Sequence, residues 1–302
     1  MPIKKISKAD VGFGIFAYSI LIFLSLCCLI PFLFIISGAF SSEQSILEHN
    51  IILHVKISNH QYSLEAFRAV FAVPENIFNA YGVTIFITIV GTVVGIFFSS
   101  MAAYVLQRKE FRPRTFFSFF FYFTTIFNGG IVPWYILMIR YFNMKNNIMA
   151  LILPNLFNVF YIIIIRSFIS NSIPDSITES AKIDGAGEFH IFVKMILPLS
   201  KPILATMGLF TALNYWNDWF NAMLFVDAQK LIPLQYYLYR MLSQISMLRN
   251  LIAKVPQLAA VTPPEESFKM AMTLVTIGPI LLLYPFVQRF FVSGIMIGAV
   301  KG

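Results

Sequence analysis

Long uncharged runs separated by short polar segments organise this sequence. Five runs contain no Asp, Glu, Lys or Arg, and a sixth, between Lys201 and Asp227, contains only Asp218. Because a helix needs about 20 mostly apolar residues to cross the ~30 Å core of a bilayer, the pattern predicts six transmembrane helices. We place these helices at about 12–40, 77–106, 115–140, 147–170, 201–226 and 268–291.

Composition supports this interpretation. Hydrophobic residues make up 58% of the 302 residues and charged residues only 12%, whereas about 25% of a soluble domain is charged. The first apolar run is longer than the ~7–15 residues of a signal-peptide core, and no small-residue cleavage site ends it, so we expect it to remain as a helix. The predicted fold class is all-α, with residues 1–76 forming a tail, one transmembrane helix and an outward loop, and residues 77–302 forming the core.

Basic residues are distributed unequally between the two sides of the predicted membrane. Of the 22 Lys and Arg residues, 13 fall on the side of the two termini and 9 on the other. The positive-inside rule therefore places both termini in the cytoplasm, together with the loop at 171–200. The loop at 227–267 is then outward. Orientation and contact with anionic lipid headgroups account for the net charge of +8, so we infer no nucleic-acid partner.

Cysteine and histidine residues give no reason to assign a metal or a disulfide. Cys27 and Cys28 are adjacent inside the first predicted helix, which excludes a structural disulfide between them. His49, His54 and His60 share the first outward loop. A metal site there is conceivable, but a solvated loop is the favoured interpretation, and we assign no metal.

The segment at 175–200 is charged and amphipathic, and it lies between two apolar runs. Ser176 and Glu179 have the S-x-x-E spacing of a capping box, which predicts a short helix that runs to about Asp184. Gly185 and Gly187 then permit a sharp change of direction.

A second short helix is predicted after this turn. Its apolar residues, from Phe192 to Leu197, recur at spacings of three and four, and Pro198 and Pro202 are expected to end it. Two short helices at an angle would form a knob. Its apolar side would lie on the bundle, and Glu179 and Asp184 would face the cytoplasm.

The 175–200 segment resembles the cytoplasmic signature of permease subunits of ATP-binding-cassette importers, E-A-A, three residues, G, nine residues, I, one residue, L-P. Ser180 replaces the second residue of the signature, and Met195 takes the position of Ile. From about residue 75 to the end, the chain is similar to the smaller permease of oligosaccharide importers of the maltose-type superfamily, of the aldouronate and complex-polysaccharide kind. Matching stretches include AAYVLQRKEF, FNGGIVPWY, ILPLSKPILAT, NYWNDWF and YPFVQRFFVSGIMIGAVKG.

The resemblance implies a type I ABC importer permease fold and a transport subunit without enzymatic activity of its own. The sequence has no G-x-x-x-x-G-K-[ST] loop to hold phosphates, so ATP and Mg are expected on partner subunits and no cofactor on this chain. The implied partners are a second homologous permease, two cytoplasmic ATPase subunits and an extracellular solute-binding lipoprotein that delivers an oligosaccharide. The implied location is the bacterial cytoplasmic membrane.

The family's coupling element maps onto the 175–200 segment. The resemblance implies that this segment docks into a groove on the ATPase, whereas the plainer alternative is that Glu179 only caps a helix and Asp184 is solvated. The residues that we expect to couple to the ATPase are Glu179, Ala181, Asp184, Gly185, Phe192, Leu197 and Pro198.

Polar side chains with interleaved aromatics mark the fifth predicted helix. Their spacing places the polar residues on one helical face, and such groups inside a membrane need a partner or a water-filled cavity. Amides, a carboxylate and aromatic surfaces suit a sugar pathway, but the same groups also join helices, and both interpretations stay open. The candidate pathway residues are Asn214, Trp216, Asn217, Asp218, Trp219 and Asn221, with Asn128, Asn155 and Asn158 as weaker candidates.

Two further segments and two rival classes complete the prediction. The outward stretch LQYYLYRMLSQISMLRNLI has helical spacing and would lie on the membrane surface or a partner, or cap the bundle. Residues Gly298 to Gly302 resemble a tail that approaches the ATPase in relatives. A secondary transporter would need its own coupling-ion carboxylates and inverted repeats, and an intramembrane enzyme a nucleophile with its base or a metal cluster. The sequence favours neither.

Overall fold

The computed structural model describes residues 8–47, 62–254 and 264–281. Within these residues the secondary structure is helical, apart from an isolated bridge between Ser41 and Tyr62, which confirms the all-α prediction. Several predicted features lie outside the described residues: the chain ends, the three histidines of the first outward loop, residues 298–302, and the last part of the sixth predicted helix.

The chain divides into two compact units. One comprises residues 1–73 and 241–279, and the other comprises residues 74–240 and 280–302. The predicted division between residues 76 and 77 stays a prediction, although the first boundary falls close to it.

The first unit contains the N-terminal helix and the helix at 265–281. The carboxylate of Glu43 accepts hydrogen bonds from the backbone N–H groups of Glu266 and Ser267, at 3.0 and 2.9 Å. These bonds satisfy donors that a helix N-terminus leaves free. The N-terminal helix is α1 (Lys8–Ala39), and the other helices of this unit are α2 (Glu43–Leu47), α3 (Glu65–Val70) and the second half of α14 (Leu234–Lys254).

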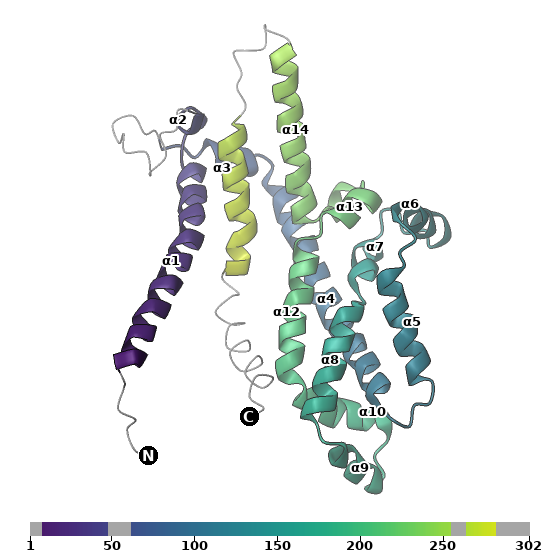
Figure 1. Ribbon diagram of the computed structural model, residues 1–302. Helices are drawn as coiled ribbons and strands as arrows, with labels where there is room; N and C mark the ends of the chain where they lie inside the picture. The colour runs from purple at the N-terminus through teal and green to yellow at the C-terminus, as the bar shows by residue number, and fades with distance from the viewer. Residues whose placement is uncertain (1–7, 48–61, 255–263, 282–302) are drawn as a thin grey trace. The chain divides into compact units, whose positions relative to one another are not determined.

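The second unit is a bundle in which α4 (Pro74–Gln107), α8 (Val159–Ser172) and α12 (Lys201–Trp216) pack along one another (Figure 1). Short helices lie across the lower end in Figure 1: α9 (Asp175–Ile183), α10 (Glu188–Ile191), the π-helix η4 (Phe192–Ile196) and α11 (Leu197–Leu199). The remaining elements are α5 (Arg114–Ile126), α6 (Ile131–Ile136), η2 (Leu137–Tyr141), α7 (Met149–Ile152), η3 (Leu153–Asn155), α13 (Phe220–Phe225), η5 (Gln229–Leu231) and the first part of α14.

Two of the predicted membrane helices are single long helices within the described residues. Val11–Ala39 and Pro74–Gln107 are single helices long and apolar enough to cross a membrane. Three further spans are bent pairs: Arg114–Ile126 with Ile131–Tyr141 at 111°, Met149–Asn155 with Val159–Ser172 at 50°, and Glu188–Leu199 with Lys201–Trp216 at 82°. The predicted segments at 115–140 and 147–170 are therefore each divided by a bend, and the segment at 201–226 is divided by the break between Trp216 and Phe220.

Identifiable side chains cause these bends. Between α5 and α6, the side-chain oxygen of Asn128 accepts a hydrogen bond from the N–H of Gly130, whose φ is +86°, and this turn ends one helix before the next begins. The helix at 188–199 ends between Pro198 and Pro202, as predicted. The turn before Pro198 is the π-helix η4. Pro198 has no N–H, so it cannot donate the next α-helical hydrogen bond after this wider turn.

A buried tyrosine joins three elements of the second unit. Tyr215 is fully buried, and its hydroxyl donates a hydrogen bond to the carbonyl of Ile152 at 2.7 Å. Its ring lies directly against Gly91 of α4, where a Cβ would come within 2.3 Å of the ring. This close approach places the end of α12 beside the 152–155 turn and brings two predicted polar groups together.

Candidate functional site

The turn between α9 and α10 is a Schellman motif centred on Gly185. The N–H of Ala186 donates to the carbonyl of Ala181 at 2.9 Å, and the N–H of Gly185 donates to that of Lys182 at 3.0 Å. This pattern needs a left-handed residue after the helix, and Gly185 has φ of +82°. The predicted change of direction at Gly185 is confirmed, whereas Gly187, with φ of −73°, adopts a conformation open to any residue.

The start of α9 differs from the prediction. Pro174 occupies the N-cap position without a side-chain hydrogen bond, and Ser176 lies inside the helix. The predicted capping box of Ser176 with Glu179 is therefore wrong. The hydroxyl of Thr178 instead bonds the carbonyl of Asp175 at 2.7 Å, and the fixed φ of Pro174 sets the direction in which the chain begins the helix.

The knob formed by residues 175–199 has a buried and an exposed face. Ala181 and Phe192 are buried, at 3% and 1% exposure, and the Phe192 ring packs on Tyr104 of α4 at 5.7 Å. Glu179 and Asp184 are exposed, as expected. The same surface carries Ile183 at 87% and Phe189 at 65% exposure. Of the other predicted coupling residues, Gly185 and Pro198 are exposed and Leu197 is half-buried.

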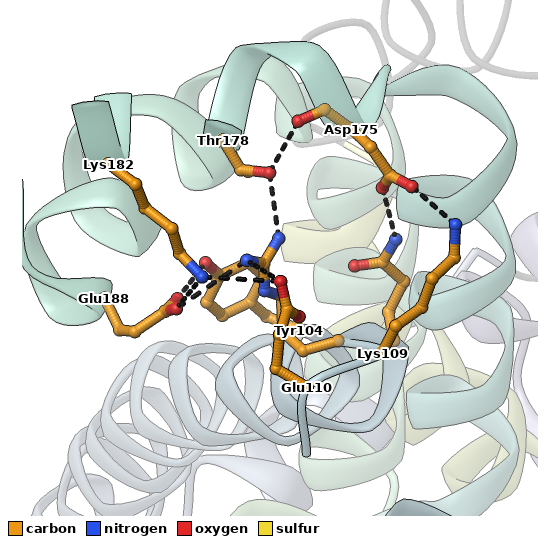
Figure 2. Close-up of polar contacts among 9 residues, drawn as sticks. Tyr104, Lys109, Glu110, Asp175, Thr178, Lys182 and Glu188 are labelled. Atoms are coloured by element: carbon orange, nitrogen blue, oxygen red, sulfur yellow. Dashed lines mark hydrogen bonds and ion pairs between the residues drawn. The ribbon is translucent and has the colours of Figure 1, made fainter. Parts of the chain in front are cut away.

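Hydrogen bonds and ion pairs connect the knob to the end of α4 and to the loop that follows it (Figure 2). Glu188 is central: Oε2 accepts from the Tyr104 hydroxyl at 2.6 Å, and Oε1 lies 2.8 Å from Lys182 Nζ. Arg108, whose side chain is 9% exposed, donates to Thr178 Oγ1 at 2.8 Å and lies 3.7 Å from Glu188. At the other end of α9, Lys109 pairs with Asp175 at 2.8 Å. The knob is thus fixed to the end of α4 at both ends of α9.

These contacts shift the titration of the groups involved. The hydrogen bond from Lys109 lowers the pKa of Asp175, and the hydrogen bond to Glu188 raises the pKa of Lys182. Partial burial acts to raise the pKa of Glu188, but hydrogen bonds from Lys182 and Tyr104 outweigh it, so the pKa of Glu188 is lowered. All three groups are charged at neutral pH.

A second polar cluster forms where the fifth predicted helix is interrupted. Asp218 Oδ2 accepts hydrogen bonds from the side-chain amides of Asn155 and Asn221, both at 2.7 Å, and Oδ1 accepts from the N–H of Asn221 at 3.1 Å. The helix α12 ends at Trp216, so the expectation that one continuous face carries residues 214–221 is wrong. The interruption turns the carboxylate toward Asn155.

Next to this cluster is an exposed surface of amides and aromatic rings. Trp219 stacks on Tyr239 of α14 with centroids 4.6 Å apart. The side chain of Asn217 accepts a hydrogen bond from Gln235 at 3.1 Å, and Asn214 donates to the Tyr161 hydroxyl at 3.2 Å. Of the predicted residues, Asn214, Asn217 and Trp219 lie on this surface, which we call the amide–aromatic face, whereas Trp216 is buried.

The weaker pathway candidates separate into different environments. Asn158 caps α8 by accepting hydrogen bonds from the N–H groups of Phe160 and Tyr161. Asn128 forms the turn before α6 and lines an open cavity of about 760 Å³ together with Phe220 of α13. Only Asn155 joins the Asp218 cluster. In the described part of the chain, no group of three His, Cys, Asp or Glu residues is arranged to hold a metal.

The sequence that forms these bent helices and the knob matches a known family. Residues 95–297 match the family described as "Binding-protein-dependent transport system inner membrane component". The chain belongs to this family.

Relatives of this permease transport sugars. It is 35% identical to the "Polygalacturonan/rhamnogalacturonan transport system permease protein YtcP" of Bacillus subtilis, over 96% of this chain and 98% of that protein. It is 27% identical to the "Arabinooligosaccharides transport system permease protein AraQ" of Halalkalibacterium halodurans, over 93% of this chain and 94% of that protein. The protein is therefore a permease subunit of a binding-protein-dependent ABC importer, a membrane transport subunit and not an enzyme.

A solved structure supports the same assignment. The permease superimposes with a TM-score of 0.76 on a chain of the "crystal structure of a bacterial ABC transporter involved in the import of the acidic polysaccharide alginate". The two chains are 29% identical, and the match covers 96% of the permease and 100% of that chain. The predicted importer permease fold is thus confirmed.

Sequence reasoning missed several residues of the permease that the structure brings forward. Ile183 and Phe189 are apolar, but they lie outside the helical face that packs on the bundle. An apolar residue outside that face was the one sign in the sequence that the position is exposed. Tyr161, Gln235 and Tyr239 lie far along the chain from the polar residues they contact. No local pattern indicates those three contacts.

Removing the charge of Glu188 tests whether the polar contacts stabilise the knob. We expect Glu188→Gln to lower the free energy of unfolding by about 1–2 kcal/mol at neutral pH, because the partly buried Arg108 and Lys182 lose their shared carboxylate. Since the pKa of Glu188 is lowered from 4.5, its contribution is present above pH 4.5 and is lost as the pH falls below that value. The difference between the two proteins should therefore shrink in acid.

Lys109→Gln is the matched control, because it breaks a pair whose side chains are 75% and 41% exposed. Thermal unfolding of the full chain in detergent measures both variants, and surface pairs contribute little. Equal destabilisation by both substitutions would contradict a special role for Glu188.

Proposed function

We propose that this permease forms one half of a heterodimeric path and is driven by cytoplasmic ATPases through the 175–199 knob. The exposed Ile183 side chain is the observation that carries this proposal, since 87% of it is accessible at the tip of a charged helix. An isoleucine so exposed, on a knob that also exposes Phe189, Glu179 and Asp184, fits a protein partner better than water. The buried Ala181 and Phe192 would support this surface from behind.

The partners follow from the same proposal. A second homologous permease would complete the path, two ATPase subunits would bind ATP and Mg, and an extracellular solute-binding lipoprotein would deliver the sugar. The knob and both termini would then lie in the cytoplasm, as the distribution of basic residues predicts. Movement of the ATPases would reach α4 through the contacts of Arg108 and Glu188.

We propose that the cargo is an oligosaccharide rich in uronate groups. The names of two similar proteins, which refer to polygalacturonan and to acidic alginate, support this class of substrate. The amide–aromatic face has suitable chemistry, because aromatic rings stack on sugar C–H faces and amides bond hydroxyls. Arg240 lies over the Tyr236 ring, 5.9 Å from its centroid, and supplies a cation for a carboxylate.

Co-purification and uptake together test this function. Affinity purification of the full chain from its native membrane should recover a second permease and an ATPase, and vesicles holding the complex should take up galacturonate oligomers in the presence of ATP. Ile183→Asp should release the ATPase but keep the second permease. Retention of the ATPase by Ile183→Asp would assign docking elsewhere, and ATP-independent uptake by this chain alone would overturn the proposal.

A further inference from the structure

A polar cavity opens at one end of the second unit, where α5 begins and α8 ends. Its volume is about 590 Å³, within the ~300–1,000 Å³ of small-molecule sites. The loop after α4, the first turn of α5, the end of α8 and the start of α9 supply its walls. Neither the amide–aromatic face nor the exposed surface of the knob includes it.

The cavity carries an excess of positive charge. Lys109 and Asp175 line it and neutralise each other through their 2.8 Å pair. Arg114 and Arg166 also line it, and among the described residues neither guanidinium has a carboxylate partner. Arg166 donates a hydrogen bond to Ser118 Oγ at 3.0 Å, which fixes its guanidinium between α8 and α5. Two half-buried cations beside one polar cavity are suited to binding an anion.

The position of Arg166 strengthens this argument. It lies within α8, before the helix ends at Ser172, in one of the predicted transmembrane segments. A charged residue in a membrane helix is costly without a partner and is a functional-site hypothesis by default. The Ser118 hydroxyl is neutral, so the charge of Arg166 is still uncompensated.

The surroundings of the cavity indicate which kind of anion it accepts. On the side of α5 that carries Arg114, Thr115 and Ser118, the following turns expose large apolar rings: Phe119 is 64% exposed and Tyr122 is 55% exposed. The cavity therefore adjoins an apolar surface within two helical turns. A ligand with an anionic head and apolar tails matches both features, and guanidinium groups bind phosphate with bidentate geometry.

We propose that this cavity binds the phosphate group of an anionic phospholipid, with Arg114 and Arg166 as its ligands. Basic pockets between membrane helices bind such headgroups in general. The acyl chains would lie along the exposed rings of Phe119 and Tyr122 on α5. A bound lipid would thereby join α5, α8 and the start of α9 where the knob leaves the bundle.

Native mass spectrometry of the full chain in detergent, titrated with phosphatidylglycerol, tests this site. We expect Arg114→Gln to weaken binding about fivefold and Arg114→Gln with Arg166→Gln about 25-fold, from the usual contribution of a basic residue near an anionic surface. The Arg114 side chain makes no hydrogen bond within the described residues, so its loss should leave folding intact. Melting temperature checks this point for each variant.

Arg112→Gln with Lys194→Gln is the matched control, because it removes the same charge from exposed residues outside the cavity. It should change binding less than about twofold, and phosphatidylcholine and inorganic phosphate should each bind at least about tenfold more weakly than phosphatidylglycerol. Equal binding of phosphatidylcholine, equal binding of inorganic phosphate, or equal weakening by the control would each overturn the proposal. So would unchanged lipid binding by the cavity variant together with loss of a co-purifying ATPase.

Discussion

Replacing Gly185 with valine should reduce ATP-driven uptake about fivefold to thirtyfold while the protein still inserts into the membrane. Gly185 ends α9 with φ of +82°, a left-handed conformation that costs a residue with a side chain about 1–2 kcal/mol. β-Branched residues are genuine outliers there. The chain would relieve this strain by shifting the turn, which displaces Ile183 and Phe189 relative to each other. The exposed surface of the knob would then no longer be complementary to the ATPase.

Gly187→Val is a closely matched control for this experiment. Both glycines lie in the same turn, and a Cβ on either would meet no atom within 4 Å. The decisive difference is the backbone angle, since Gly187, at the N-cap of α10, has φ of −73° and ψ of 155°, which valine adopts readily. Uptake into vesicles and the amount of inserted protein should be measured together. Unchanged uptake in Gly185→Val, or an equal loss in both variants, would refute the role of this turn.

Asp218→Ala should lower the amount of folded protein, whereas Asn214→Ala should alter uptake without doing so. Asp218 accepts the amides of Asn155 and Asn221 and so joins segments that are 63 residues apart. Removing it leaves these donors without their shared acceptor, and we expect a destabilisation of about 1–3 kcal/mol. Membrane contacts of this type fall toward the lower end of that range.

Asn214 provides the contrast, because it is exposed and makes one side-chain hydrogen bond, to Tyr161. Its loss should leave the protein level intact and change the relative uptake of different oligosaccharides. Thermal unfolding and competition uptake with a panel of galacturonate oligomers measure the two effects. An Asp218→Ala protein of normal stability but altered preference would place the carboxylate in the sugar path instead.

The membrane helices and the permease signature could be predicted from local patterns. Uncharged runs indicate where the chain crosses a membrane, because each apolar helix satisfies its own backbone within the bilayer. The Gly185 turn was also predictable from a local pattern. A glycine can adopt the left-handed conformation that ends a helix at little steric cost. The capping box at Ser176 failed because Pro174 already sets the start of α9.

Local sequence patterns could not predict the contacts between segments that are distant in the chain. Tyr104 and Glu188 lie 84 positions apart, and their 2.6 Å hydrogen bond exists because α10 packs on the end of α4. The interruption after Trp216 likewise follows from packing, since Tyr215 is held against Gly91 and by the carbonyl of Ile152. These contacts depend on helix separation and angle, which hydropathy does not encode.

The amino-acid sequence was sufficient to predict a helical membrane permease with a turn at Gly185, because apolar length and glycine conformation act over a few neighbouring residues. Only the tertiary structure distinguishes the side chains that pack inside the knob from those on its surface. Ala181 and Phe192 lie in the core while Ile183 and Phe189 are exposed, and Asp218 faces two amides. Burial and pairing are properties of neighbours brought together by packing, so no single stretch of sequence contains them.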